Sequence, residues 1–268
     1  MTIVGYFRIV ASMSAQTILF LNQKGGVGKT TSAVNLGSAL AQRGKKVLLI
    51  DLDSQGNLTS ATSIDNRKKG IYEVFAGQCS VEEAIQQTPI QNLFAIASNI
   101  NMAGLNIELV EEERREFFLK NALLGLDERW DYIIADCPPS LGLVTVNAMV
   151  WAKQVIIPMQ CEYFAMEGLN LLMRTVGNMK KSLNPDLQVL GILFTMYSKR
   201  TKLANEVVED ISSFFPHLVF NTIIPRNIRI AEAPSHGLPI NVYDSASSGT
   251  KAYKALAEEV IARVARNH

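Results

Sequence analysis

Cysteine is scarce in this sequence, and long apolar runs are missing. The three cysteines lie far apart and form no Cys-x-x-Cys pair, so neither a disulfide framework nor a tetrahedral thiolate metal site is expected. No apolar run approaches the roughly 18 residues that a membrane-spanning helix requires. Residues 1–15 are partly apolar, but Arg8 interrupts them and no basic segment precedes them, which disfavours a signal peptide. The expected compartment is the cytoplasm.

An excess of charge of one sign is also missing. The formal net charge of +1 neither favours nor excludes a polyanionic partner, because a basic patch can lie within a balanced total. No linker, repeat or low-complexity tract interrupts the 268 residues, of which 48% are hydrophobic. We therefore expect one globular domain at residues 13–268. Residues 1–12 are expected to be an N-terminal extension, either an optional disordered segment or a start-site artefact, because Met13 lies just before the first clear strand.

Short apolar runs rich in Ile, Leu and Val recur along the chain. They lie at 18–21, 47–50, 93–96, 132–135, 154–158 and 189–194. Segments with helical length and periodicity follow most of these runs, at 29–41, 105–124, 143–152, 166–181, 203–214 and 250–266. This alternation is typical of a parallel sheet that helices bury on both faces. The predicted fold class is α/β, with a mostly parallel central sheet in a single domain.

A glycine-rich segment lies between the first apolar run and the first helical segment. Residues 23–30 read QKGGVGKT, which is a variant of the phosphate-binding loop GxxxxGK[ST]. Glycines let the backbone approach phosphates closely, and a helix that begins near Lys29 directs the positive end of its dipole at them. A purely structural turn is the alternative, but the strand before the loop and the helix after it favour a P-loop NTPase. The residues expected to hold the nucleotide are Lys24, Gly25, Gly26, Val27, Gly28, Lys29, Thr30 and Thr31.

Lys29 is the expected phosphate lysine, and Thr30 is the expected ligand of Mg²⁺. Two residues depart from the ordinary loop: Gln23 stands where the first glycine belongs, and Lys24 adds a second lysine. This loop resembles the deviant Walker A loop of the ParA/MinD family of partitioning and positioning ATPases.

The resemblance to this family extends over most of the chain. It continues at 47–60, 132–142, 191–210 and 223–244, and is weak at 65–128. It is closest to the Soj branch of chromosomal ParA proteins, which are small and have no separate N-terminal DNA-binding domain. The resemblance implies a nucleoid-associated ATP hydrolase that uses ATP and Mg²⁺, dimerises on ATP, binds DNA non-specifically and is stimulated by a ParB/Spo0J-type protein.

Three aspartates follow apolar runs. Asp51 and Asp53 come after the run at 47–50, and Asp136 ends the run at 132–135, where parallel strands present groups to ligands. Asp51 and Asp53 would point the same way if the strand continued. Asp136 has the position of a metal-binding Walker B aspartate. The resemblance implies that Asp53 positions the attacking water and that Asp51 supports the metal and the loop, although a cap or turn role is the alternative for any single aspartate.

Other roles come from the resemblance. It implies that Lys24 contacts the phosphates of a partner subunit's nucleotide, whereas a solvated lysine is the alternative. Pro225 and Asn227 are expected to border the base, while Arg226 is expected to face solvent. No Asn-Lys-x-Asp motif is present, which disfavours a GTPase.

Basic residues gather at two places in the C-terminal half. Lys199, Arg200 and Lys202 form one group, and Arg226 and Arg229 form another. Such groups are usually solvated surface. The resemblance implies that Arg200 and Arg229 contact DNA phosphates, which would bind without reading sequence, and Lys199 and Lys202 are assigned to the same surface.

The main alternative is the MinD branch of the family, which ends in a membrane-binding amphipathic helix. Here the last helical segment, 250–266, has apolar residues at helical spacing but lacks bulky Phe or Trp, so it is predicted to pack against the domain. Iron–sulfur carriers on the same core would need paired cysteines. A binding module without hydrolysis is disfavoured by the complete set of loop and carboxylate residues. The apolar residues at helical spacing in segment 250–266 are Leu256, Val260 and Val264.

Overall fold

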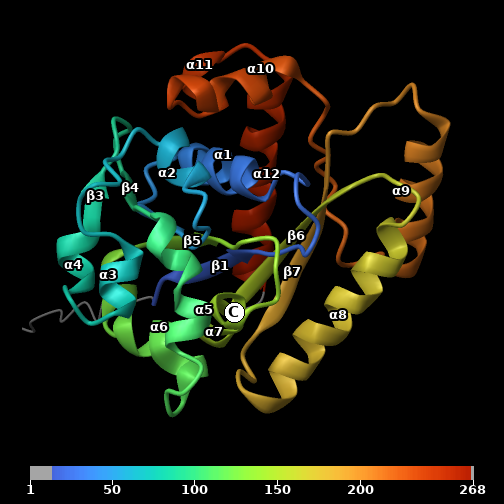
Figure 1. The fold of residues 1–268 in the computed structure, drawn as a ribbon. Helices are drawn as coiled ribbons and strands as arrows, with labels where there is room; N and C mark the ends of the chain where they lie inside the picture. Colours follow the sequence, from blue (N-terminus) through green and yellow to red (C-terminus); the bar gives the residue numbers. More distant parts are fainter. Residues whose placement is uncertain (1–13, 267–268) are drawn as a thin grey trace, which may run out of the picture.

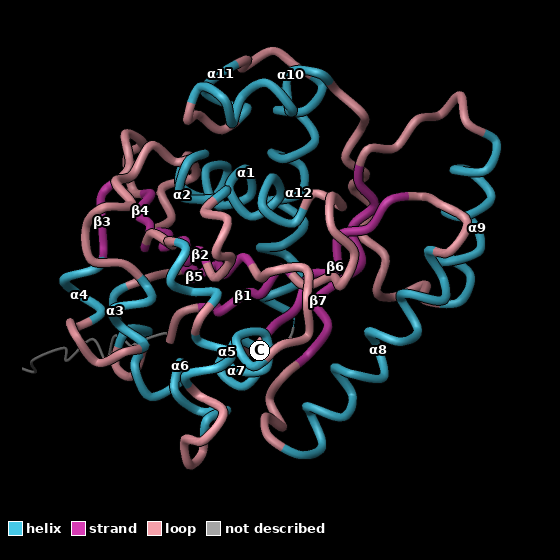
Figure 2. The backbone as a smooth tube through the Cα atoms, viewed as in Figure 1, coloured by secondary structure: helices cyan, strands magenta, loops and turns pink. Residues whose placement is uncertain are grey.

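The computed structural model describes residues 14–266 and shows a central sheet with helices on both faces (Figure 1). The predicted extension at residues 1–12 lies outside the described residues. The sheet has seven strands in the order β3-β4-β2-β5-β1-β6-β7, and Figure 2 shows them as one layer inside the helices. The strands are β1 Gln16–Phe20, β2 Val47–Asp51, β3 Ile85–Gln87, β4 Leu93–Ile96, β5 Tyr132–Asp136, β6 Gln154–Gln160 and β7 Gln188–Thr195.

All neighbouring strands are parallel except β3, which pairs antiparallel with β4. The predicted α/β class with a mostly parallel sheet is therefore confirmed, and each of the six apolar runs is a strand. The sequence prediction missed β3, because its three residues, Ile-Gln-Gln, form a short, partly exposed edge strand without an apolar run.

The longer helices agree closely with the predicted segments. They are α1 Lys29–Ala41, α7 Leu143–Trp151, α8 Ala165–Ser182, α9 Lys202–Phe214 and α12 Ser248–Arg266. The shorter elements are α2 Asn57–Ala61, α3 Ile71–Phe75, α4 Val81–Ala84, η1 Ile100–Ala103, α5 Leu105–Glu108, η2 Arg115–Phe117, α6 Phe118–Ala122, η3 Leu126–Arg129, α10 Ile228–Glu232, η4 Ala233–His236 and α11 Ile240–Tyr243.

The predicted helix at 105–124 is wrong, because this segment is broken into α5, η2 and α6. No apolar residue lies between Val110 and Phe117, so a continuous helix would have no stripe to bury over nearly two turns. The intervening residues begin with three consecutive glutamates, all exposed, and Arg114 has a left-handed backbone with φ of 55°. Packing against the core therefore fixes α5, η2 and α6, whereas the exposed glutamates between α5 and η2 have no buried face.

Side-chain alternation along β1 divides the core into two clusters. Leu19 packs with residues of α7 and α8 on one face of the sheet, whereas Ile18 and Phe20 pack with α1 and α12 on the other. All three side chains are fully buried, which stabilises the fold by about 1.5–3 kcal/mol each. Because both faces of the sheet are buried, successive residues of a strand are apolar, and each strand except β3 contains a continuous apolar run in the sequence.

The strand order brings the predicted site residues to one edge of the sheet. β5 lies between β2 and β1, so Asp136 stands beside Asp51 in one pair and beside Phe20 in the other. The glycine loop leaves β1 at this carboxyl edge. From there the chain continues to β2, which lies on one side of β1 in the sheet, whereas β6 lies on the other side. Open α/β sheets bind ligands at such a switch point.

Among residues 14–266, no helix has both the length and the apolar character needed to cross a membrane.

Candidate nucleotide-binding site

The glycine loop joins β1 to α1 with two left-handed residues. Gly26 has φ of 72°, and Gly28, the N-cap of α1, has φ of 83°, a conformation that disfavours side chains. Thr195 at the end of β7 supports the loop, because its hydroxyl donates to the carbonyl of Val27 at 2.8 Å. The N-terminus of α1 thereby lines a cavity of about 610 Å³ together with residues of the loop.

Lys29 is the first residue of α1, and its side chain lies in the wall of this cavity. Its ammonium donates to the carbonyl of Lys24 at 3.2 Å, and only 7% of the residue is exposed. Burial lowers the pKa of Lys29, while the nearby carboxylate of Asp136 partly opposes this shift. A phosphate in the cavity would therefore meet a largely desolvated positive charge.

Thr30 and Asp136 meet at the bottom of the site. The Thr30 hydroxyl donates to Oδ2 of Asp136 at 2.5 Å, and Oδ1 of this fully buried carboxylate has no hydrogen-bond partner. Burial, together with the like charge of Asp51, raises the pKa of Asp136 well above its ordinary value. An unpartnered buried acceptor beside a hydroxyl fits a cation, which would favour the ionised carboxylate.

These residues do not form a complete metal cage. Within residues 14–266, no group of three or more His, Cys, Asp or Glu residues has the arrangement of a metal site. Mg²⁺ is commonly held by one or two protein ligands together with phosphate oxygens and water. Thr30 and Asp136 therefore fit a magnesium ion that arrives with a nucleotide.

Asp51 and Asp53 take different positions. β2 ends at Asp51, so the continued strand that would align the two side chains is not present. Asp51 is fully buried: Oδ2 accepts from the amide and hydroxyl of Thr59 at 2.9 and 2.7 Å, and Oδ1 accepts from the amide of Asp53 at 3.2 Å. Burial raises its pKa to about 6. Asp51 thus holds α2 against the end of β2, and its role toward a metal stays a prediction.

Asp53 lies in the wall of the phosphate cavity. It is 9% exposed, and its Oδ1 accepts from the amide of Gln55 at 3.0 Å. This bond fixes the orientation of the carboxylate. The cavity therefore combines Lys29, Thr30 and Asp53, as the sequence predicted.

A second hollow, of about 420 Å³, adjoins the phosphate cavity and shares three lining residues with it. Pro225 and Asn227 line it, and their predicted place beside the base stays a prediction. Several apolar side chains complete the wall, which suits the face of an aromatic ring. The sequence prediction missed Met196, which lines both hollows and has φ of 51°, since nothing in the sequence marks this unusual backbone. The other lining residues of this second hollow that the prediction did not place there are Thr195, Ile224, Arg226, Ile228, Ile230, Ala231 and Tyr253. The lining residues of the phosphate cavity that it missed, apart from Met196, are Val34, Asn35, Gln55, Asn57, Ser60, Ala61, Pro139, Pro234, Ser235 and Leu238.

Lys24 lies outside the phosphate cavity. Its side chain is 59% exposed and forms an ion pair with Glu162, which precedes α8. The two residues line a separate small hollow. Lys24 therefore does not line the phosphate cavity of its own chain. Val27, the other predicted loop residue that is absent from the cavity wall, is buried and lines the same small hollow.

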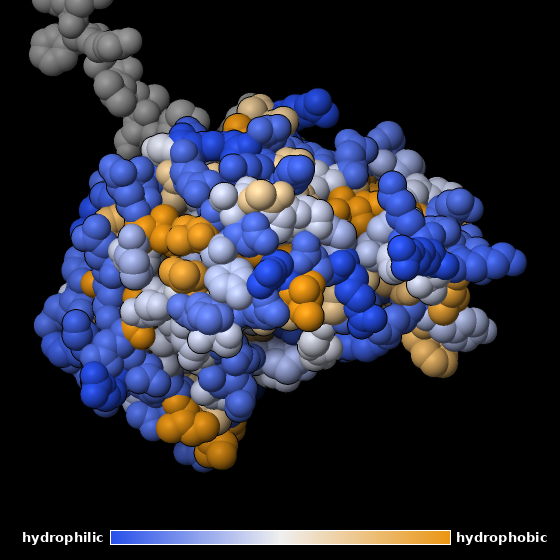
Figure 3. All heavy atoms as spheres, turned by 90° about the horizontal axis from the view of Figure 1, so that it is seen from above, coloured by the Kyte–Doolittle hydropathy of each residue, from blue (hydrophilic) through white to orange (hydrophobic). Residues whose placement is uncertain are grey.

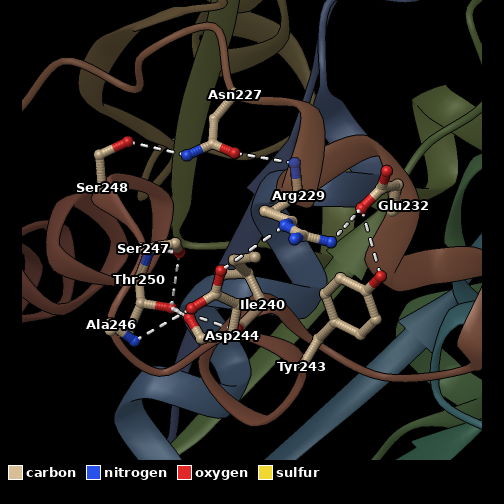
Figure 4. A network of polar contacts seen from close by, with 10 residues as sticks. All are labelled: Asn227, Arg229, Glu232, Ile240, Tyr243, Asp244, Ala246, Ser247, Ser248 and Thr250. Carbon is tan, nitrogen blue, oxygen red and sulfur yellow. Dashed lines mark hydrogen bonds and ion pairs between the residues drawn. The ribbon is translucent and has the colours of Figure 1, made fainter.

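The predicted DNA-binding residues differ in their surroundings. Lys199 and Arg200 are exposed, and neither forms an ion pair within the described part of the chain. Lys202 lies 3.5 Å from Glu206 on α9. Arg229 on α10 pairs with two carboxylates (Figure 4). Arg226 is exposed, as expected, and lines a hollow with Lys199 and Arg200.

The C-terminal helix α12 packs against the sheet. Leu256 and Val260 are fully buried, Val264 is 6% exposed, and the helix contacts α1 and β7. Its apolar face is therefore committed to the core, which confirms the predicted packing role.

Comparisons with known proteins agree with this arrangement. A family model described as an AAA domain matches residues 15–189. The chain is 50% identical to the chromosome-partitioning ATPase Soj of Treponema pallidum, over 92% of this chain and 98% of that protein. It is 48% identical to the sporulation initiation inhibitor protein Soj of Bacillus subtilis, over 91% and 98% of the two chains.

A solved structure gives the same fold. It is that of cobyrinic acid a,c-diamide synthase from Mycobacterium smegmatis with bound ADP and magnesium, with a TM-score of 0.82 and 34% identity. The match covers 95% of this chain and 97% of that one.

Proposed function

The chain belongs to the ParA/MinD-type family of P-loop ATPases, in which Soj proteins are its relatives, and we propose from this that it partitions DNA at the expense of ATP. In this proposal the protein uses ATP and Mg²⁺, dimerises on ATP, binds DNA non-specifically on the nucleoid, and hydrolyses ATP faster when a ParB/Spo0J-type protein binds. The Soj relatives support it more strongly than the synthase does, because identity to them is 48–50% against 34%.

One observation carries the proposal. The phosphate cavity holds Lys29, Thr30 and Asp53, with Asp136 beneath them, whereas the additional lysine of the loop, Lys24, stands outside it and is exposed. Within its own chain the Lys24 side chain pairs with Glu162 and contributes nothing to the phosphate cavity. A second chain that approaches the loop would meet Lys24.

The residues of the cavity have distinct roles in this mechanism. Lys29 neutralises charge on the outer phosphates, and Thr30 and Asp136 would hold Mg²⁺, which supplies further neutralisation of phosphate charge when bound. Asp53 accepts a hydrogen bond from the attacking water and orients it, since Gln55 already fixes the carboxylate. Gly26 and Gly28 let backbone amides face the phosphates.

Lys24 completes the site of a second subunit in the proposed dimer. A Cβ added to Gly25 or Gly26 would meet no atom within 4 Å, so the loop leaves room for a close approach by another chain. The Lys24 ammonium would exchange Glu162 for the partner's phosphates, where it stabilises charge that develops during transfer. Hydrolysis would then depend on assembly.

The proposal is tested by three single variants measured for ATP binding, ATP-dependent dimerisation and turnover. We expect Lys29→Ala to lose ATP binding, because the buried cation is removed from the phosphate cavity. We expect Asp53→Ala to bind ATP and accumulate as a dimer with turnover reduced at least about 100-fold, the lower end for loss of a general base. We expect Lys24→Ala to bind ATP but not to dimerise.

Binding would be followed with a fluorescent ATP analogue and assembly by sedimentation. Turnover at the parent rate in Asp53→Ala, with or without an activating partner, would contradict the catalytic role. Equal loss of all three activities in Lys24→Ala would indicate a local defect of the loop instead of a role across the dimer.

A further inference from the structure

Arg229 is opposed by two carboxylates (Figure 4). Its Nη1 lies 3.0 Å from Oε2 of Glu232 on the same helix, and its Nε lies 3.8 Å from Oδ2 of Asp244, which follows α11. One guanidinium therefore faces two negative charges. A DNA phosphate that approaches Arg229 would have to replace these groups and would be repelled by them.

Both carboxylates are held in place by other groups. Oε2 of Glu232 also accepts from the hydroxyl of Tyr243 at 3.2 Å. Oδ1 of Asp244 accepts from the amide of Ala246 at 3.2 Å, and the carbonyl of Asp244 accepts from the Thr250 hydroxyl at 2.7 Å. Glu232 lies on α10 itself and is held by Tyr243 of α11, whereas Asp244 follows α11 and is held by groups at the start of α12.

Two of the other cations assigned to DNA, Lys199 and Arg200, have different surroundings, and Arg226, which was expected to face solvent, lies beside them. Lys199, Arg200 and Arg226 line a hollow of about 640 Å³, and no carboxylate residue lines it. Figure 3 shows that the face seen from above Figure 1, on the side of α10 and α11, is mostly hydrophilic, with apolar residues in small separate groups. Such a face suits a charged partner.

The helix that carries Arg229 also borders the second hollow, beside the phosphate cavity. Asn227 lines that hollow, and its Oδ1 accepts from the amide of Arg229 at 2.8 Å, while its Nδ2 donates to the Ser248 hydroxyl at 2.8 Å. A base that accepts a hydrogen bond from Asn227 would compete with the Ser248 hydroxyl for its Nδ2, and could thereby shift the side chain that caps the first turn of α10. The position of Arg229 is linked to the nucleotide hollow by one side chain.

We propose that Glu232 and Asp244 form an intramolecular clamp that competes with DNA phosphates for Arg229, and that Asn227 connects this clamp to the nucleotide hollow. In this proposal Arg229 contacts DNA less readily while it is paired with the two carboxylates, and a nucleotide beside Asn227 favours its release. This inference rests on the proposed function, specifically on DNA binding by the ATP-bound protein.

The test measures DNA affinity by fluorescence anisotropy, without nucleotide and with ATP, for Asp244→Asn and Glu232→Gln. Each variant removes one of two exposed ion pairs of modest strength, so affinity without nucleotide should rise about two- to fivefold. The DNA affinity measured with ATP should change less. The ratio of the DNA affinity with ATP to that without nucleotide should therefore fall. Glu82→Gln is the matched control, because it changes the net charge equally and breaks an exposed pair with Arg129 at 2.7 Å.

A double variant shows whether the gain depends on Arg229. Arg229→Ala in the Asp244→Asn background should cancel the rise, since no guanidinium is left to release. The clamp is overturned if both clamp variants keep the parent affinity without nucleotide, if Glu82→Gln produces the same gain, or if the gain persists without Arg229. If the parent fails to bind DNA even with ATP, the proposed function itself fails, and the two failures are therefore distinguishable.

Discussion

Gly25, Gly26 and Gly28 share one loop at the residue scale but serve different purposes. Gly26 and Gly28 have left-handed backbones with φ of 72° and 83°, whereas Gly25 does not. A Cβ at Gly25 would also meet no atom within 4 Å in the single chain. Gly25 is therefore not required by the fold of its own chain, and the space beside it is available to a second subunit.

Gly25→Val should separate folding from assembly. We expect the variant to fold and bind ATP like the parent, but to lose ATP-dependent dimerisation, because a β-branched side chain crowds the approach of two loops. Gly26→Val is the comparison, and it should lose about 1–2 kcal/mol of stability because its backbone is left-handed. Thermal melting and sedimentation with ATP measure the two effects. Normal dimerisation of Gly25→Val on ATP would count against the proposed interface.

At the scale of elements, one arginine fastens α12 to the sheet. The Arg263 guanidinium donates to the carbonyls of Leu190 and Leu218, each at 3.0 Å, and lies 4.1 Å from the centre of the Phe220 ring. Glu259, one turn earlier, pairs with it at 2.9 Å. The last helix is thus held by polar contacts as well as by its buried apolar face.

Arg263→Met should destabilise the protein by about 2–4 kcal/mol, because the part-buried carbonyls of Leu190 and Leu218 each lose a donor and Glu259 loses its cationic partner. Arg266→Met, on the exposed side of the same helix, should change stability by less than about 0.5 kcal/mol. Urea unfolding of both variants gives the comparison. Equal small effects would show that apolar burial alone holds α12.

Glu259 makes the free energy of unfolding depend on pH. Burial alone would raise its pKa, but hydrogen bonds from the amides of Asn221 and Thr222 and from Arg263 hold the pKa below its ordinary value. The folded state then binds the proton less readily than the unfolded state. The stabilisation is therefore present above the ordinary glutamate pKa of about 4.3 and is lost as pH falls through the lower folded value.

Glu259→Gln should remove this component. We expect the variant to be less stable than the parent at neutral pH, and the difference between them to shrink below about pH 4 as Glu259 of the parent takes up a proton. Unfolding free energies between pH 3 and 7 provide the measurement. A difference that stays constant over this range would rule out Glu259 as its source.

At the scale of the whole molecule, a net charge of +1 conceals an uneven surface. Lys199, Arg200 and Arg226 are exposed around one hollow without a lining carboxylate, while many other cations of the described chain are paired with acids. Such a surface attracts a polyanion although the protein as a whole is nearly neutral. The buried apolar face of α12 disfavours the membrane-binding alternative.

Arg200→Ala should weaken DNA binding about equally on unrelated sequences, because phosphate contacts do not read bases. The slope of log affinity against log salt should become shallower by roughly 0.9 per lost phosphate contact, and by about twice that for a dimer. Arg174→Ala, an exposed arginine of α8, is the control with equal charge change. Titrations would use ATP in an Asp53→Ala background. Unchanged affinity in Arg200→Ala, with ATP-dependent sedimentation of the parent on anionic lipid vesicles, would instead favour the MinD-like function.

The sequence by itself determined the parts of this protein that depend on neighbouring residues. Apolar runs located six strands, because a strand buried on both faces needs continuous apolar residues. The glycine spacing located the phosphate loop, and α1 begins and ends at the predicted residues 29 and 41. Lys29, Thr30 and Asp53 were predicted to share one site, and in the fold all three line one cavity.

Only the tertiary structure decided the parts that depend on distant residues. The break of 105–124 follows from which side chains find a buried partner, and the left-handed backbone of Met196, which lines two hollows, has no mark in the sequence. Arg200 and Arg229 look alike in sequence, yet one is unpaired within the described chain and the other faces Glu232 and Asp244. The availability of a cation depends on the charges that folding brings near it, and residue type alone does not specify these.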